Sequence, residues 1–183
     1  MKTMLACSIG LTALLIASTS LSAKGLTIKI TINGARLVTP IEIDDATVIA
    51  PFQVWAGPGT KTCVRNVCRE GTEGFIVNWS SGFVTEPPAG LQRYEVTFYA
   101  SEEQRTPDGS RFETLSPRIV YIVLYVQDAS TGQGYVYLPT GTDDERYGVN
   151  TSSIYRGGLE RHWFRATDSW DSVAAPLVAR GVR

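Results

Sequence analysis

Side chains that can perform acid–base or nucleophilic chemistry are scarce in this chain of 183 residues. His162 is the only histidine, which excludes sites that need two, such as a His-Glu-x-x-His zinc site. The Gly-x-Ser-x-Gly motif of a serine nucleophile is also absent. His162 is therefore a weak candidate for a catalytic base. This role requires a carboxylate or a serine within about 3 Å of the imidazole in the folded chain.

Two of the three cysteines, Cys63 and Cys68, are expected in the mature protein, because Cys7 lies in the amino-terminal apolar segment. Four residues separate the two cysteines, whereas two residues separate those of a thioredoxin-type motif. Two cysteines are also too few for a zinc site closed by thiolates alone. A two-residue turn at Arg65-Asn66 would place them opposite one another, within the distance that a disulfide spans. The spacing therefore predicts a disulfide that shapes a surface loop.

The carboxylates Asp143, Asp144 and Glu145 lie together in the segment 140–148 and are ligands of the kind that calcium binds. The alternating spacing of an EF-hand loop is missing, and a solvated acidic loop explains the same residues. No pair of carboxylates can be assigned as the two groups of a glycosidase, because their separation depends on the fold. The sequence thus predicts no metal site, and it contains no cofactor motif.

Aromatic residues are the one chemical surplus, with four tryptophans and eight tyrosines. Their rings can form a platform for a glycan or a peptide, although most are expected to fill the core of a β-rich domain. The predicted ligand-binding residues lie on one hairpin: Tyr121, Tyr125, Tyr135 and Tyr137.

That hairpin spans Arg118–Pro139. Its first strand, Ile119–Val126, is apolar on both faces, as in the middle of a sheet. Gly132 can close a three-residue loop before the second strand, Tyr135–Leu138.

A three-residue loop pairs Tyr125 with Tyr137 and makes one face of the hairpin aliphatic and the other rich in tyrosine. A four-residue loop would shift the pairing by one and divide the tyrosines between both faces, because side chains alternate along a strand. The tyrosine face is thus conditional on the shorter loop.

Three further elements follow from hydrophobic periodicity. Leu26–Ile32 alternates as a strand, and Asn33-Gly34 predicts a type I′ turn that pairs Ile30 with Leu37. Arg93–Ala100 also alternates, and an apolar stripe predicts a helix over about 168–175 that is capped by Thr167 or Asp168 and ended by Pro176. The expected fold class is α+β, mainly antiparallel sheet with one short C-terminal helix; an all-β sandwich or barrel is the alternative.

The amino terminus has the three parts of a secretory signal peptide over residues 1–23, with cleavage after Ala23 or Ser22. Residues 24–183 then form a single β-rich domain in the periplasm or outside the cell. Loss of Lys2 leaves 16 basic and 18 acidic residues, a net charge of −2. Neither this balance nor the later sequence indicates nucleic acid as a partner or a membrane span.

Four segments, ITINGARLVTPIEIDDA, RYEVTFYA, YVQDASTGQGYVYLP and RHWFRATDSWD, resemble small exported bacterial proteins of unknown function. The resemblance implies a bacterial origin, an envelope or extracellular location and one α+β domain, and it implies no site residue.

The leading hypothesis is an exported, non-enzymatic domain that binds a protein, a peptide or a glycan at the cell envelope. The alternative is a small secreted hydrolase that uses His162 with a nearby carboxylate or serine. A third interpretation, an accessory or structural subunit, would require an exposed apolar patch.

Overall fold

The computed structural model describes residues 25–34, 36–64, 67–70, 75–105 and 111–182, and for 62–64, 67–70, 102–105 and 111–115 the backbone only. The predicted signal peptide, residues 1–23, lies outside these ranges. In chain order the elements are β1 Thr27–Gly34, β2 Ile41–Ile43, α1 Ala46–Ile49, β3 Lys61–Val64, β4 Val67–Glu70, η1 Trp79–Ser81, β5 Phe83–Val84, β6 Arg93–Arg105, β7 Arg111–Gln127, β8 Gly134–Tyr137, η2 Glu145–Tyr147, α2 Gly148–Ser153, β9 Trp163–Arg165 and α3 Asp168–Gly181.

Seven of the described strands form one sheet in the order β2-β1-β6-β7-β8-β9-β5, and each neighbouring pair is antiparallel. The strands β3 and β4 form a separate hairpin. This arrangement confirms the α+β class dominated by an antiparallel sheet. Because the sheet begins at β2 and ends at β5, it is open, and the alternative of a closed barrel does not describe it. Pro40 directly precedes the edge strand β2, as expected for a residue that cannot donate to a ladder.

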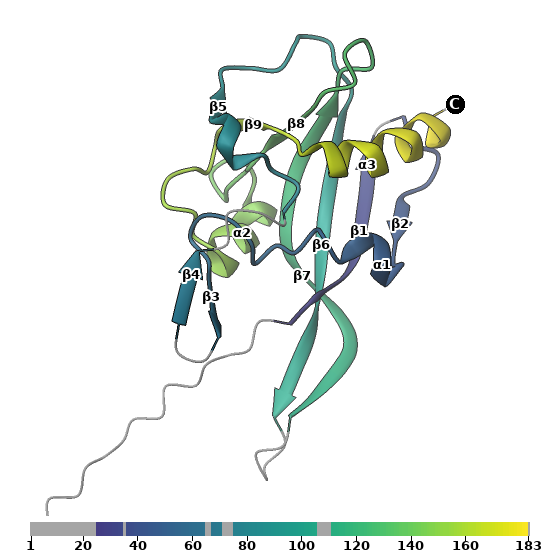
Figure 1. Cartoon of the computed structure of the whole chain (residues 1–183). Coiled ribbons are helices and arrows are strands. Elements are labelled where there is room, and N and C mark those ends of the chain that lie inside the picture. The colour runs from purple at the N-terminus through teal and green to yellow at the C-terminus, as the bar shows by residue number, and fades with distance from the viewer. Residues whose placement is uncertain (1–24, 35, 65–66, 71–74, 106–110, 183) are drawn as a thin grey trace, which may run out of the picture.

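One face of the sheet is covered by α3, α1 and the segments 50–56 and 75–79 (Figure 1). Trp170 of α3 is fully buried at the centre of this layer. Its ring meets Phe52 edge-on at 5.2 Å and Tyr125 of β7 at 6.0 Å. Each such ring removes a large apolar area from water, so this layer is the hydrophobic core.

The register of the central hairpin differs from the predicted one. Tyr125 pairs with Val136, and Leu124 pairs with Tyr137, one residue away from the expected partners. The loop has four residues because the Asp128 N–H donates to the Gln133 carbonyl at 3.0 Å. The Asp128 carboxylate also accepts from the Ser130 N–H at 2.9 Å, which closes a turn that the three-residue prediction missed.

The amino-terminal hairpin forms with a longer loop than predicted. Ile30 pairs with Ile43 rather than with Leu37, and β1 continues through Gly34. Asn33-Gly34 forms no type I′ turn, since neither residue has a positive φ. Gly34 instead lies under the Tyr94 ring, where a Cβ would come within 2.5 Å of a ring carbon. Pairing with the long strand β6 has therefore outweighed the local turn preference.

The carboxy-terminal helix begins where predicted and continues further. The Thr167 hydroxyl accepts from the Trp170 N–H at 3.3 Å, which confirms it as the cap. The helix runs through Pro176 to Gly181, so the predicted end near residue 175 is wrong. Proline there removes one N–H from the helix, while the apolar stripe still packs on the sheet: Trp170, Val173, Ala174, Leu177 and Val178.

The hairpin of β3 and β4 has the predicted register, with Cys63 opposite Cys68 and Val64 opposite Val67. The side chains of residues 62–64 and 67–70 are outside the described part of the chain. The disulfide therefore stays a prediction, compatible with the backbone pairing.

Candidate functional site

The second face of the sheet carries the candidate site. Residues that are paired across antiparallel strands project to the same side, so the register sorts the side chains into rows. The core face has the row Tyr94, Tyr125, Val136 and Phe164. The opposite face has two neighbouring rows, one of Glu95, Leu124, Tyr137 and Trp163, and one of Arg93, Val126, Tyr135 and Arg165.

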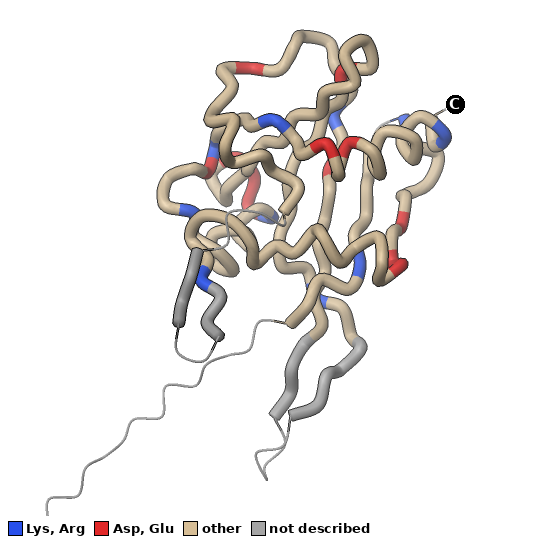
Figure 2. The backbone as a smooth tube through the Cα atoms, viewed as in Figure 1, with Lys and Arg blue, Asp and Glu red and all other residues tan. Residues whose placement is uncertain are grey.

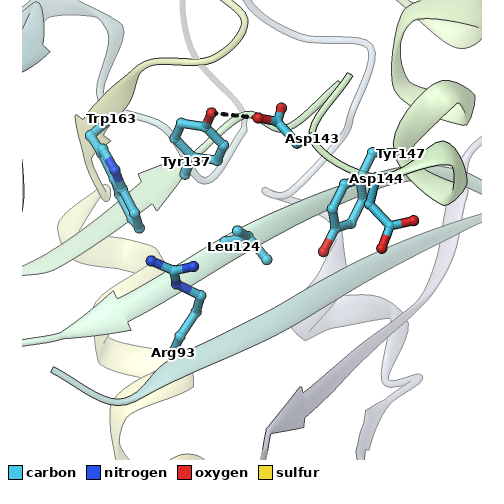
Figure 3. Close-up of a pocket in the computed structure, with 7 residues that line it drawn as sticks. All are labelled: Arg93, Leu124, Tyr137, Asp143, Asp144, Tyr147 and Trp163. Carbon is cyan, nitrogen blue, oxygen red and sulfur yellow. Dashed lines mark hydrogen bonds between the residues drawn. The ribbon is translucent and has the colours of Figure 1, made fainter. Parts of the chain in front are cut away.

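A shallow groove crosses this second face over β6 to β9. Its main hollow has a volume of about 430 Å³ and is lined by Arg93, Leu124, Tyr137, Asp143, Asp144, Tyr147 and Trp163. Two adjoining hollows of about 360 and 230 Å³ also contain Arg93 in their walls. We call these three hollows together the sheet groove. Figure 3 shows Trp163, Tyr137 and Arg93 around one end of the main hollow and Asp144 and Tyr147 at the other.

The aromatic end of the groove consists of Trp163 of β9 and Tyr137 of β8. They are cross-strand partners, and their rings lie 5.2 Å apart at 43°. The Arg93 guanidinium lies 5.9 Å from the Trp163 ring, within the range of a weak cation–π contact. Because these three side chains come from paired strands, their positions are set by the sheet rather than by a loop.

The loop 140–144 forms one wall of the groove and is held by Asp143. One carboxylate oxygen accepts from the Thr140 N–H at 2.8 Å, and the other accepts from the Tyr137 hydroxyl at 3.1 Å. Desolvation by burial and this bond raise the pKa of Tyr137, so its hydroxyl stays protonated at neutral pH.

The far wall is positioned by α2. Asn150 is fully buried, and its side-chain carbonyl accepts from the Ile122 N–H at 2.7 Å. Its amide donates to the Ile122 carbonyl at 2.7 Å and to the Pro139 carbonyl at 2.8 Å. The Asn150 side chain thus provides hydrogen-bond partners for the backbone N–H and carbonyl of Ile122 in β7, beyond the end of β8. These bonds fix α2 against the sheet.

Tyr147 joins this wall to β6. Its hydroxyl donates to Glu95 at 3.1 Å and accepts from Arg146 at 2.7 Å, and Arg146 pairs with Glu95 at 3.0 Å. Burial, followed by the proximity of Glu95, raises the pKa of Tyr147. Arg146 also pairs with Asp144 at 3.2 Å, so each of these two carboxylates has a cation as partner.

Asp143 and Asp144, considered above as possible calcium ligands, serve as local caps and ion-pair partners. Asp144 accepts from the Arg146 N–H at 3.1 Å at the start of η2. Within the described residues, no three His, Cys, Asp or Glu side chains lie together in a way that could hold a metal ion. Asp143 and Asp144 line the main hollow of the groove.

His162 is exposed and directly precedes β9. Its Nδ1 lies 2.8 Å from the Glu160 carbonyl, and its ring stacks on Phe83 at 4.3 Å. Among the described residues, no carboxylate or serine side chain is hydrogen bonded to the imidazole. The described residues therefore do not bring His162 together with the carboxylate or serine that a hydrolase would require.

The four hairpin tyrosines lie on two faces, because the predicted register was wrong. Tyr121 and Tyr125 are fully buried on the core face. Tyr135 and Tyr137 are half-buried on the face that carries the groove, and Tyr137 lines it.

Sequence reasoning missed Arg93, Leu124, Tyr147 and Trp163 as lining residues. The alternation of apolar and polar residues in Arg93–Ala100 already placed Arg93 and Glu95 on the face of the strand that points away from the core. A comparable assignment for Trp163 requires its pairing with Tyr137, which is a long-range property.

Comparisons of the chain with protein-family models, with curated proteins and with solved structures find no match. Across the described ranges, no helix combines the length and the apolar character that crossing a membrane requires.

Proposed function

We propose that this protein binds a glycan in the sheet groove, as a non-enzymatic domain exported to the cell envelope. The observation that carries the proposal is the pair of tilted rings, Trp163 and Tyr137, at one end of an open polar groove. A pyranose ring presents an apolar C–H face and a rim of hydroxyls. The first fits against an aromatic ring, and the second fits the polar walls.

The polar groups of the groove suit sugar hydroxyls. Tyr137 and Tyr147 supply hydroxyls, while Asp143 and Asp144 supply acceptor oxygens along one wall. These groups are already oriented by bonds within the protein, so a ligand would not have to order them.

A peptide fits this groove less well than a glycan. Extended peptides are commonly recognised by pairing with a free sheet edge or by insertion into an apolar groove. The sheet groove lies over the interior strands β6 to β9, each of which already has a strand on both sides in the sheet order. A peptide backbone would find no unpaired ladder there.

Support for export comes from the signal-peptide pattern of residues 1–23 and from the predicted disulfide between Cys63 and Cys68. Fractionation of native cells and sequencing of the mature amino terminus would test it. Retention of residues 1–23 on a cytoplasmic protein would contradict export without affecting the groove.

The binding proposal is tested by calorimetric titration of the mature protein with a panel of neutral and acidic oligosaccharides. Trp163→Ala should weaken any binding by roughly tenfold or more, as loss of one aromatic contact implies. Tyr155→Ala is the matched control, because Tyr155 is 67% exposed and does not line the groove.

Circular dichroism would show that both variants are folded. The proposal is overturned if no oligosaccharide binds, if only peptides bind, or if Tyr155→Ala weakens binding as much as Trp163→Ala.

A further inference from the structure

The charged groups of the groove differ in whether they have a partner within the protein. The carboxylates of Glu95, Asp143 and Asp144 each have a partner within the protein: Arg146 at 3.0 Å for the first, the Tyr137 hydroxyl at 3.1 Å for the second and Arg146 at 3.2 Å for the third. In the described part of the chain, the Arg93 guanidinium has neither an ion pair nor a hydrogen bond. Its contact is the Trp163 ring at 5.9 Å.

Arg93 also has a central position. It lines all three hollows of the sheet groove, whereas Trp163 lines two of them. A ligand that occupies any part of the groove therefore lies near this cation. Figure 3 shows the guanidinium reaching from β6 to the aromatic end, below Tyr137 and beside Trp163.

The overall charge does not account for this arrangement. Acidic and basic segments are interspersed over the described backbone, as Figure 2 shows, and the chain carries a net charge of −1. The cation beside the aromatic end of the groove is Arg93, and its field extends over about the Debye length, ~8 Å at physiological salt.

We propose that the glycan bound in the sheet groove contains a carboxylate-bearing sugar residue, whose carboxylate pairs with Arg93 while its ring lies against Trp163. The inference rests on the proposed function, because it identifies the class of glycan. A guanidinium presents two parallel N–H donors that match the two oxygens of a carboxylate, and such pairs are stronger than hydrogen bonds between neutral groups. Binding gives Arg93 the acceptor that it lacks among the described residues, while Glu95, Asp143 and Asp144 keep their partners within the protein.

The test compares an oligogalacturonide with its methyl ester, which keeps the sugar rings and removes the charge. Calorimetry on the mature protein at low and at physiological salt should show the acid binding about tenfold to a hundredfold more tightly, the range of one charge-assisted bond. The difference should shrink as the salt concentration rises.

Arg93→Gln should abolish the preference for the acid, so that acid and ester bind the variant with similar affinity. Arg118→Gln is the matched control, since Arg118 is an exposed arginine of β7 that does not line the groove. This control should keep the full preference. Equal losses in the two variants would show a non-specific charge effect and overturn the inference.

Two other results separate the inference from the proposed function. If acid and ester bind the wild-type protein equally, Arg93 does not recognise a carboxylate, while glycan binding stands. If neither binds and an acidic peptide does, both proposals are wrong.

Discussion

The hydroxyl of Tyr125 donates a hydrogen bond of 2.8 Å to the carboxylate of Asp171, and this bond joins the central strand β7 to helix α3. The second carboxylate oxygen accepts from the Gly134 N–H at 2.7 Å, at the start of β8. A side chain at position 134 would not fit, because a Cβ would lie 2.0 Å from the carboxylate. Asp171 thus ties the helix to both strands of the hairpin that supplies Tyr137 to the groove.

Asp171→Asn should lower the free energy of unfolding by roughly 1–3 kcal/mol, because a single amide oxygen must serve two buried donors. Urea denaturation at neutral pH measures this loss. Asp168→Asn is the control, since it removes a charge from the same first turn at an exposed position. A loss for Asp171→Asn no larger than the control would show that the bonds contribute no net stability.

The stability difference between the wild type and Asp171→Asn should also depend on pH. Burial raises the pKa of Asp171 above its ordinary value of 3.8, so the folded state binds a proton more tightly than the unfolded state. The contribution of this group is fully present below pH 3.8 and is lost as the pH rises through the folded pKa. The advantage of the wild type should therefore grow on acidification through that window, and a shrinking advantage would mean that the folded pKa is lowered.

Arg156→Met should destabilise the protein by roughly 3 kcal/mol or more, since several buried carbonyls would lose their donor. Arg156 is 1% exposed, donates to the Val54 carbonyl at 2.7 Å and lies 5.0 Å from the Phe75 ring. Chemical denaturation compares this variant with Arg165→Met, which removes an exposed arginine and should change stability little. Similar midpoints for both variants would contradict the structural role of Arg156.

Asn150→Ala should destabilise the protein by roughly 3 kcal/mol, because three buried hydrogen bonds are lost together. Hydrogen exchange at the Ile122 amide, which Asn150 caps, should accelerate more than exchange at the Val123 amide. Asn78→Ala is the control and should cost about 1 kcal/mol, as for an ordinary helix cap. An unchanged exchange rate at Ile122 would show that α2 does not hold this end of the groove.

Much of the fold could be predicted because the relevant signals are local. The alternation of Arg93–Ala100 identified a strand and its buried side, and Tyr94, Val96, Phe98 and Ala100 are all in the core. The cap and the apolar stripe of α3 were predicted for the same reason. The candidate site was predicted only in part, since Tyr137 lines the groove while Tyr121 and Tyr125 lie in the core.

The sequence by itself determined the strands predicted from Leu26–Ile32, Arg93–Ala100 and Ile119–Val126 and the start of helix α3, because periodicity and capping act over a few residues. Only the tertiary structure decided the registers of the central and amino-terminal hairpins, because a shift of one residue exchanges the two faces of a strand. Tyr125, whose ring packs on Trp170 and whose hydroxyl donates to Asp171, pairs with Val136 rather than with Tyr137. The same shift turns Tyr137 toward Trp163 on the opposite face and so creates the groove.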